Sequence, residues 1–286
     1  MNYSTLKELI ELAEKYDRRI GEIVQEVEAE QENLTLEKVW EKMKTSWTVM
    51  SQAIQSGLTN ENRSVSGLTG GDAKRLHESK PAYLSSELSK AVAMALGVAE
   101  VNACMGKIVA CPTAGSCGIV PAALTFAQGK HGYRDEEIIS SLFTAAGIGI
   151  VCSINASISG AKGGCQAECG VASAMAASAL VELSGGNPEM VGHAVAISLI
   201  NQMGLVCDPV AGLVEIPCIQ RNAGSLMQGI LAAEQALAGI KIIIPVDEVI
   251  EAMQEVGEAL PESLKETSEG GLATTPTGRR IADRLR

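Results

Sequence analysis

The sequence has few aromatic residues, no excess of positive charge and no apolar leader. Aromatics make up 3% of its 286 residues, whereas 29 residues are glycine. Small residues let helices approach closely, so we expect a core packed from helices with few large side chains. The formal net charge is −11, and an acidic chain lacks the phosphate attraction that drives nucleic-acid binding. Without a basic stripe it also lacks attraction to a membrane surface. We therefore expect neither nucleic acid nor a membrane as a partner.

The N-terminal residues 1–20 are charged and contain no apolar stretch of the kind found in secretory signals. This predicts a cytoplasmic protein, in which thiols stay reduced. The eight cysteines are then not a disulfide framework. Because free cysteine is among the most buried residue types, Cys104 and Cys152 are expected to be packing residues inside the core.

Helical patterns dominate the chain. Apolar residues recur at near-helical spacing over residues 4–30, and a second helix is expected over 35–56 with Thr35 as its N-cap. We interpret residues 1–57 as an N-terminal helical arm, and 58–286 as the main domain, which ends in a flexible tail. Strand patterns are weak, since the β-like run at 240–246 is interrupted by a proline.

Two segments almost free of charge are expected to form the centre of the fold. Residues 138–161 carry no charge and are long enough to span a membrane. Their serines, asparagine and glycines, and the lack of basic flanks, favour a buried core helix instead. Residues 190–206 are similar. The predicted fold class is therefore all-α: a compact helical domain with buried, small-residue central helices.

Three cysteines lie at the ends of predicted elements. Cys207 follows an apolar helix and precedes Asp-Pro, whereas Cys165 and Cys218 each precede a helical pattern. A helix N-terminus stabilises a thiolate. The intervals between the three match neither the short C-x-x-C pairs of structural zinc nor the ferredoxin run. Spacing alone therefore leaves both a metal site and buried structural cysteines open.

Four motifs carry a resemblance to a known family: RSVSGLTGGDAKRL (63–76), PTAGSCGIVPA (112–122), SGAKGGCQAECGVASAMAA (159–177) and CDPVAGLVEIPCIQRNA (207–223). Together they resemble the α-chain signature of the iron–sulfur-dependent bacterial L-serine dehydratases, over nearly the whole chain. Some members are single chains with an N-terminal β domain; this chain is similar to the separate α chain of the two-chain type.

The resemblance implies a [4Fe–4S] cluster held by Cys165, Cys207 and Cys218. It also implies conversion of L-serine to pyruvate and ammonia, in partnership with a β chain. Hydroxide is a poor leaving group, and a Lewis acid on the substrate hydroxyl lowers that barrier. The other cysteines, among them Cys111, Cys117 and Cys169, are expected not to be ligands.

Two loops are expected to bind the substrate carboxylate through backbone N–H groups, as anion nests do. The candidate substrate-binding residues are Ser66, Gly67, Thr69, Gly70 and Gly71 in one loop, Thr113, Gly115 and Ser116 in the other, and in addition Asn155 and Arg221. For the general base, the chain offers His77 and Lys162 as candidates. The β chain could also supply it.

Two other interpretations stay open at this point. A pyridoxal-phosphate dehydratase would use a Schiff-base lysine and a glycine-rich phosphate cradle, which "SGAKGG" with Lys162 superficially offers. No βαβ pattern accompanies it, however. The second alternative is a non-enzymatic helical partner subunit whose thiols are merely buried.

Overall fold

The N-terminal sequence forms two helices rather than one. The computed structural model describes residues 1–285. In it, α1 (Leu6–Lys15) is followed by its C-cap residue Tyr16, and α2 begins at Ile20. Asp17 between them has a left-handed φ of 52°, which a continuous helix cannot contain. The expected single helix over 4–30 is therefore wrong. The prediction of Thr35 as an N-cap is confirmed, since its hydroxyl accepts a hydrogen bond from the Lys38 N–H at 3.3 Å.

Within residues 1–285 the chain is built from helices and connecting loops, and it contains no β-strand, so the predicted all-α class is confirmed. After α1 and α2 (Ile20–Gln31), the further helices are α3 (Leu36–Thr59), α4 (Asp72–Glu78), α5 (Ser86–Ala103), α6 (Ile119–His131), α7 (Asp135–Asn155), α8 (Gly160–Gly163), α9 (Val171–Leu183), α10 (Pro188–Gln202), α11 (Cys218–Leu237), α12 (Val246–Ala259) and α13 (Pro276–Leu285).

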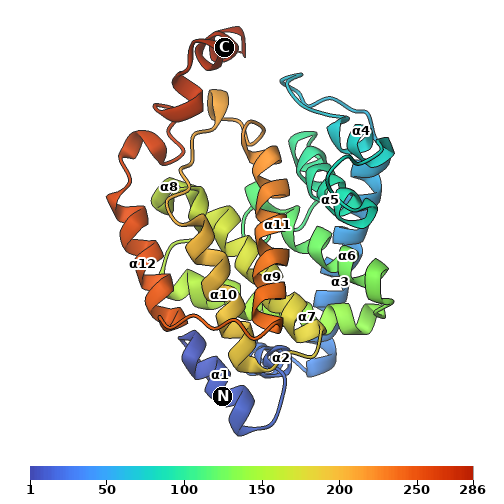
Figure 1. The fold of residues 1–286 in the computed structure, drawn as a ribbon, viewed down its shortest axis with the longest axis vertical. Helices are drawn as coiled ribbons and strands as arrows, with labels where there is room; N and C mark the ends of the chain where they lie inside the picture. The colour runs from blue at the N-terminus through green and yellow to red at the C-terminus, as the bar shows by residue number, and fades with distance from the viewer. Residues whose placement is uncertain (286) are drawn as a thin grey trace.

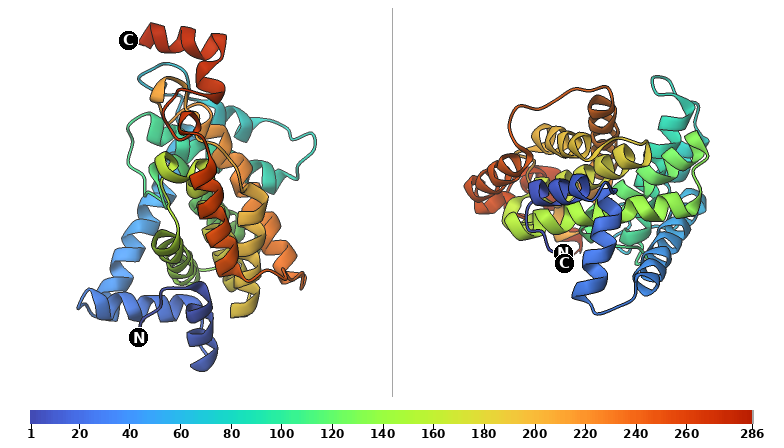
Figure 2. Two further views of the ribbon diagram at one scale, coloured as in Figure 1. Left: turned by 90° about the vertical axis from the view of Figure 1, so that its left-hand side faces the viewer. Right: turned by 90° about the horizontal axis from the view of Figure 1, so that it is seen from below.

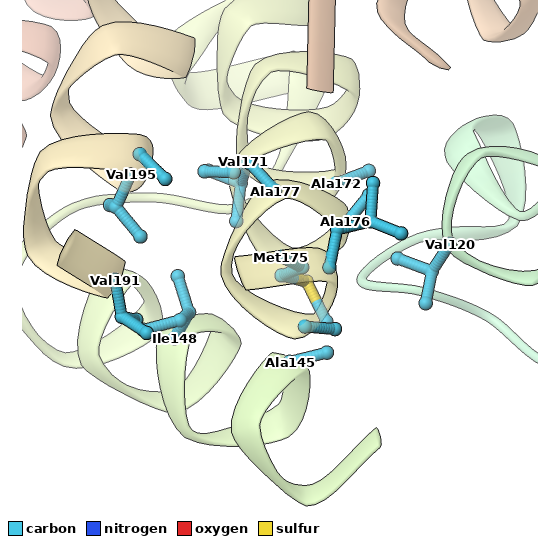
Figure 3. Close-up of a cluster of buried hydrophobic side chains, with 14 of the residues drawn as sticks. Val120, Ala145, Ile148, Val171, Ala172, Met175, Ala176, Ala177, Val191 and Val195 are labelled. Atoms are coloured by element: carbon cyan, nitrogen blue, oxygen red, sulfur yellow. The ribbon is translucent and has the colours of Figure 1, made fainter. Parts of the chain in front are cut away.

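The centre of the molecule is α9, every residue of which is buried. It packs against α7, α10, α11 and α6, and Figure 3 shows its Val171 and Met175 among side chains of those neighbours. The alanine-rich sequence of α9 explains its place, because small side chains let four helices approach one axis. The charge-free segments 138–161 and 190–206 flank it as α7 and α10.

Helix α7 is long and apolar enough to cross a membrane by composition alone, but most of its apolar window is buried inside the fold. A core helix of a helical bundle has these properties. The prediction of a buried core helix is confirmed, except at its C-terminal end, where Ser153 and Ile154 are exposed.

The first three helices contribute fully buried side chains to the main core, among them Leu6, Leu9, Ile20 and Ile23. The division of the chain at residue 57 stays a prediction. At the other end, the expected tail contains α13. Figures 1 and 2 show α1 and α2 at one end of the molecule and α13 at the opposite end.

The loops that carry the sequence motifs gather at the end of the molecule that bears α13 (Figure 1). The loop after α3, the loop before α6 and the loop before α11 all reach this end. Helix α5 contacts both α4 and α11, and so connects two of the motif-bearing segments.

Candidate thiol site

Three buried cysteines come from three separate segments. Cys165 directly precedes a π-helical turn (Gln166–Gly170) that leads into α9, and Cys218 is the first residue of α11. Cys207 lies in an extended segment. Their exposed fractions are 2%, 8% and 3% respectively.

Burial and the neighbouring thiols raise the pKa values of Cys207 and Cys218. Burial raises the pKa of Cys218 to about 12, with a further contribution from Cys165. The pKa of Cys207 is also raised, mainly by burial and in addition by Glu168, Cys165 and Cys218. Each of these contributions requires the partner to be close, since charges in a protein interact over short range.

Cys165 differs from the other two thiols. Its pKa is lowered, chiefly by a hydrogen bond with the Cys169 thiol and with help from the Arg221 guanidinium. The pKa of Cys169 is raised by the same hydrogen bond and by burial. Cys165 is therefore the thiol of this group that most readily becomes a thiolate.

Arg221 fixes the segment that carries Cys207. Its Nη1 donates to the Val206 carbonyl oxygen and its Nη2 to Asp208 Oδ1, each at 2.7 Å. The buried Asp208 in turn accepts the Leu272 N–H at 2.8 Å. A predicted site residue thus holds both neighbours of Cys207, through an aspartate that the sequence analysis did not select.

Glu168 is a further acidic group at the thiols. Its Oε1 accepts from the Thr113 hydroxyl at 2.9 Å and its Oε2 accepts from Cys207 Sγ at 3.7 Å. Burial raises its pKa. Gly160 makes the approach possible, since a Cβ there would lie 2.4 Å from Glu168 Oε2 and 3.0 Å from Cys207 Sγ.

Sequence reasoning missed Glu168, although a signal was present. It is the one charged residue in residues 163–180, a stretch of small and apolar residues. A lone carboxylate in such a segment needs a buried partner.

The loop 112–118 is tied to the start of α11. The fully buried Asn222 donates to the Gly115 carbonyl oxygen at 2.7 Å and to that of Cys218 at 2.9 Å, and accepts the Gly118 N–H at 2.9 Å. Ser116 is also fully buried, and its hydroxyl donates to the Cys111 carbonyl oxygen at 3.2 Å. Of the predicted residues in this loop, Thr113 is the one whose side chain contacts the thiol site.

The loop after α3 is held by Glu215. This buried carboxylate accepts hydrogen bonds from the hydroxyls of Ser64 at 2.7 Å, Ser66 at 2.9 Å and Thr69 at 2.8 Å. The predicted residues Ser66 and Thr69 therefore direct their hydroxyls at the segment between Cys207 and Cys218. The other predicted residues of this loop, Gly67, Gly70 and Gly71, have left-handed φ values.

Three predicted residues have no contact with the cysteines. Lys162 and Asn155 are exposed and line a separate pocket of about 450 Å³. The Asn155 side-chain amide donates to the Ser4 carbonyl oxygen at 2.6 Å, so it holds the N-terminal segment. His77 lies half-buried on α4, and its Nδ1 has no hydrogen-bond partner among the described residues.

All eight cysteines are free. Cys152 is fully buried, as predicted, whereas Cys104 is only half-buried, so that expectation is wrong for Cys104. It lies at the C-terminal end of α5, where the chain turns outward, and its thiol donates to the Asn62 carbonyl oxygen at 3.5 Å.

The donor set fits an iron–sulfur cluster better than a single ion. Across residues 1–285 no three Cys, His, Asp or Glu side chains converge on one ion position. A cubane does not need this convergence, because each thiolate binds a different iron and the sulfurs stand roughly 6 to 7 Å apart. The three buried, free thiols, with the small residue Gly160 beside Cys207, are of the ligand type that such a cluster takes.

The fold is all-helical, and its buried free thiols are donors of the type that soft metals bind. A sequence model described as "Serine dehydratase alpha chain" matches residues 15–273. The chain belongs to this family, the α chains of the iron–sulfur type of L-serine dehydratase, which are lyases.

Two alpha-chain relatives agree with this assignment over nearly their full length. The chain is 47% identical to the probable L-serine dehydratase, alpha chain, of Bacillus subtilis, over 99% of this chain and 95% of that protein. It is 44% identical to the L-serine dehydratase, alpha chain, of Peptoniphilus asaccharolyticus, over 97% and 96%. With the L-serine dehydratase of Streptomyces coelicolor it shares 37% identity, over 95% of this chain but 60% of the longer protein.

Proposed function

We propose that this chain is the α subunit of a cytoplasmic L-serine dehydratase, and that Cys165, Cys207 and Cys218 hold a [4Fe–4S] cluster at which L-serine is converted to pyruvate and ammonia. The observation that supports the proposal is that all three thiols are free and buried, with Glu168 in contact with Cys207 and Arg221 holding the segment on either side of it. The family match supports iron–sulfur chemistry over the pyridoxal-phosphate alternative and over a non-enzymatic subunit.

The reaction removes the Cα proton and the β-hydroxyl of serine, and the resulting aminoacrylate tautomerises and is hydrolysed to pyruvate and ammonia. When bound, the cluster supplies a Lewis acid that makes the hydroxyl a better leaving group. Everything else must come from protein groups that bind and orient the amino acid.

We assign the substrate carboxylate to the backbone N–H groups of the loops at 66–71 and 113–116, which border the thiol site. Glu215 keeps the first loop in place through the hydroxyls of Ser66 and Thr69. This gives those two predicted residues a positioning role, while Gly67 at the turn of the loop is exposed.

We assign the substrate ammonium to Glu168, the carboxylate that contacts both Thr113 and Cys207. A carboxylate held in a partly buried site attracts a cation strongly. The hydrogen bond from Thr113 fixes the direction of one oxygen and leaves the other, Oε2, facing the thiols.

The alpha-chain names of two relatives imply a two-chain enzyme. Among the described residues, the hydrogen-bond partners of the three cysteines and of Glu168 include no histidine and no lysine. We therefore assign the group that takes the Cα proton to the second chain rather than to His77 or Lys162.

The test is a pair of cysteine substitutions in the anaerobically purified enzyme. Cys207→Ser should abolish the broad visible absorbance, lower the iron and sulfide content and remove serine dehydratase activity, because one cluster ligand is lost. The control Cys104→Ser changes a half-buried thiol outside the site and should preserve all three. A Cys207→Ser protein that keeps its absorbance and activity would refute the ligand assignment.

A further inference from the structure

Helix α11 contains a glycine that the isolated chain does not need. Gly224 is exposed in the helix interior, and a Cβ built on it would meet nothing within 4 Å. Gly229, one turn further on the inner face, differs, since its Cβ would lie 2.9 Å from the Ser173 carbonyl oxygen of α9. Glycine in a helix interior lowers stability relative to alanine. The packing of this chain therefore explains Gly229 but not Gly224.

Two side-chain amide atoms in the groove that Gly224 lines lack hydrogen-bond partners. Gln202, at the end of α10, is 7% exposed. Its Oε1 accepts from the Ser225 hydroxyl, but its buried Nε2 has no hydrogen-bond partner among the described residues. Gln228 Oε1 is likewise buried without a partner. Buried polar groups left unpaired are costly, so each of these atoms calls for a ligand group.

Gly224, Gln202 and Gln228 line one groove of about 560 Å³ between α10 and α11. The groove thus offers one free donor and one free acceptor, which is the hydrogen-bonding complement of a peptide group. A glycine at its edge allows a partner backbone to approach closely.

The groove is neutral in a chain of net charge −11. Its lining contains no acidic residue, and its one cation, Arg221, is neutralised by Asp208. Ile200 on α10 and Leu231 on α11, the two helices that border the groove, are 41% and 47% exposed. Uncharged amides between exposed apolar side chains are typical of a protein-binding surface rather than of a site for a charged metabolite.

We propose that this groove binds a main-chain segment of the second chain of the enzyme, whose backbone packs against Gly224 and pairs with Gln202 Nε2 and Gln228 Oε1. This inference rests on the proposed two-chain function. The Streptomyces relative favours a second chain over a second copy, since about two-fifths of that longer protein lies outside the match to this chain.

The groove shares a side chain with the segment that carries Cys207. Arg221 lines the groove and also holds Val206 and Asp208, the two neighbours of Cys207. A segment bound in the groove therefore rests on the same side chain that positions one of the proposed cluster ligands.

The experiment measures binding of the purified β chain to α-chain variants by sedimentation and by titration calorimetry. Gly224→Leu, which places a bulky side chain in the groove, should weaken binding at least tenfold. Gly224→Ala should raise the melting temperature of the isolated α chain by about 2 °C through helix propensity, and yet weaken binding. The control Gln52→Leu adds the same side chain at an exposed position of α3 and should change neither property.

The visible absorbance of the α chain separates this inference from the proposed function, since all three variants should retain it. If Gly224→Leu and Gly224→Ala both bind the β chain as tightly as the unchanged protein, the groove assignment is wrong while the two-chain enzyme stands. Dissociation of an α-chain dimer by Gly224→Leu, with β-chain binding intact, would assign the groove to a second copy instead. Failure of the unchanged α chain to bind the β chain would overturn the two-chain assignment itself.

Discussion

The buried acidic residues of this chain divide into those at the thiol site and those that hold the fold. Glu182 on α9 belongs to the second group. It is 5% exposed, and it accepts the Gly21 N–H at 3.2 Å and the Thr144 hydroxyl. It thereby joins the start of α2 and the middle of α7 to the central helix.

Replacement of Glu182 by glutamine should change how stability depends on pH. Burial raises the pKa of Glu182, against the opposing effect of its hydrogen bonds. The folded state therefore binds the proton more tightly than the unfolded state, so this group favours folding most below its unfolded pKa of about 4.3 and progressively less as pH rises through the folded value. Glutamine does not ionise, so Glu182→Gln removes this loss. The melting temperature of the variant relative to that of the unchanged protein should therefore be higher at pH 7 than at pH 4.

Melting curves between pH 4 and 7 test this expectation, with Glu182→Ala as the comparison. Alanine leaves the Gly21 N–H without an acceptor and should cost about 1–3 kcal/mol near pH 4, and less at pH 7, since it also removes the buried carboxylate that ionises. A Glu182→Gln protein whose melting temperature differs from the unchanged protein by the same amount at pH 4 and pH 7 would contradict the assignment.

At the residue scale, the assignment of the three cysteines as ligands stays a prediction, and the side chains around them were harder to foresee from the sequence. Cys165, Cys207 and Cys218 were found through motifs, because a cysteine at an element end is visible in the sequence. The roles of Glu168, Asp208 and Glu215 were missed, because each depends on partners 13 to 151 residues away. Long-range hydrogen bonds of this kind leave no local pattern.

Elements were predicted where periodicity is strong and missed where one residue changes the path. The small-residue segments that became α7 and α10 were recognised by their lack of charge. The break between α1 and α2 was missed, because the left-handed conformation of Asp17 has no signal beyond a weak preference of aspartate for it. The loop at 61–71 was recognised as a loop, but its anchor, Glu215, lies about 150 residues further along the chain.

The loop at 61–71 should become mobile when Glu215 is replaced by alanine. The substitution leaves three hydroxyls, those of Ser64, Ser66 and Thr69, without their shared acceptor. Hydrogen exchange should show faster amide exchange in this loop, because local opening is controlled by such contacts. If the loop binds the substrate carboxylate, KM for L-serine should rise at least tenfold.

The visible absorbance of Glu215→Ala should be retained, because the three proposed cluster ligands are unchanged. Glu61→Ala, which removes an exposed carboxylate at the start of the same loop, serves as the control and should leave KM near its original value. Unchanged exchange and KM in Glu215→Ala would show that Glu215 does not anchor the loop.

At the scale of the whole molecule, the thiol site is built from parts of the chain that are far apart in the sequence. The first motif follows α3, and the last contacts come from the C-terminal segment, which lies beside Cys207. The Cys207 N–H donates to the Leu264 carbonyl oxygen at 2.9 Å, and the Cys207 carbonyl oxygen accepts the Glu266 N–H at 2.8 Å. The C-terminal segment therefore belongs to the site, although its sequence resembles a flexible tail.

Two truncations separate the part of the C-terminal segment that supports the site from α13. A chain that stops after Thr275 loses α13 but keeps the hydrogen bonds of Leu264 and Glu266 to Cys207, and that of Leu272 to Asp208. It should retain its visible absorbance and iron content. A chain that stops after Leu260 loses all of these contacts, which frees Cys207 and leaves the buried Asp208 with one partner fewer.

The shorter chain should therefore fail to hold the cluster, because ordering of a metal site and metal binding are coupled. Iron and sulfide analysis after anaerobic purification measures this. Far-ultraviolet circular dichroism should show that the helical core persists, because α9 packs against α7, α10, α11 and α6, none of which the truncation removes. Loss of iron in both truncations would show that the contacts that support the site come from α13. Retention of iron in both would show that the segments around Cys165 and Cys218 order Cys207 without the C-terminal segment.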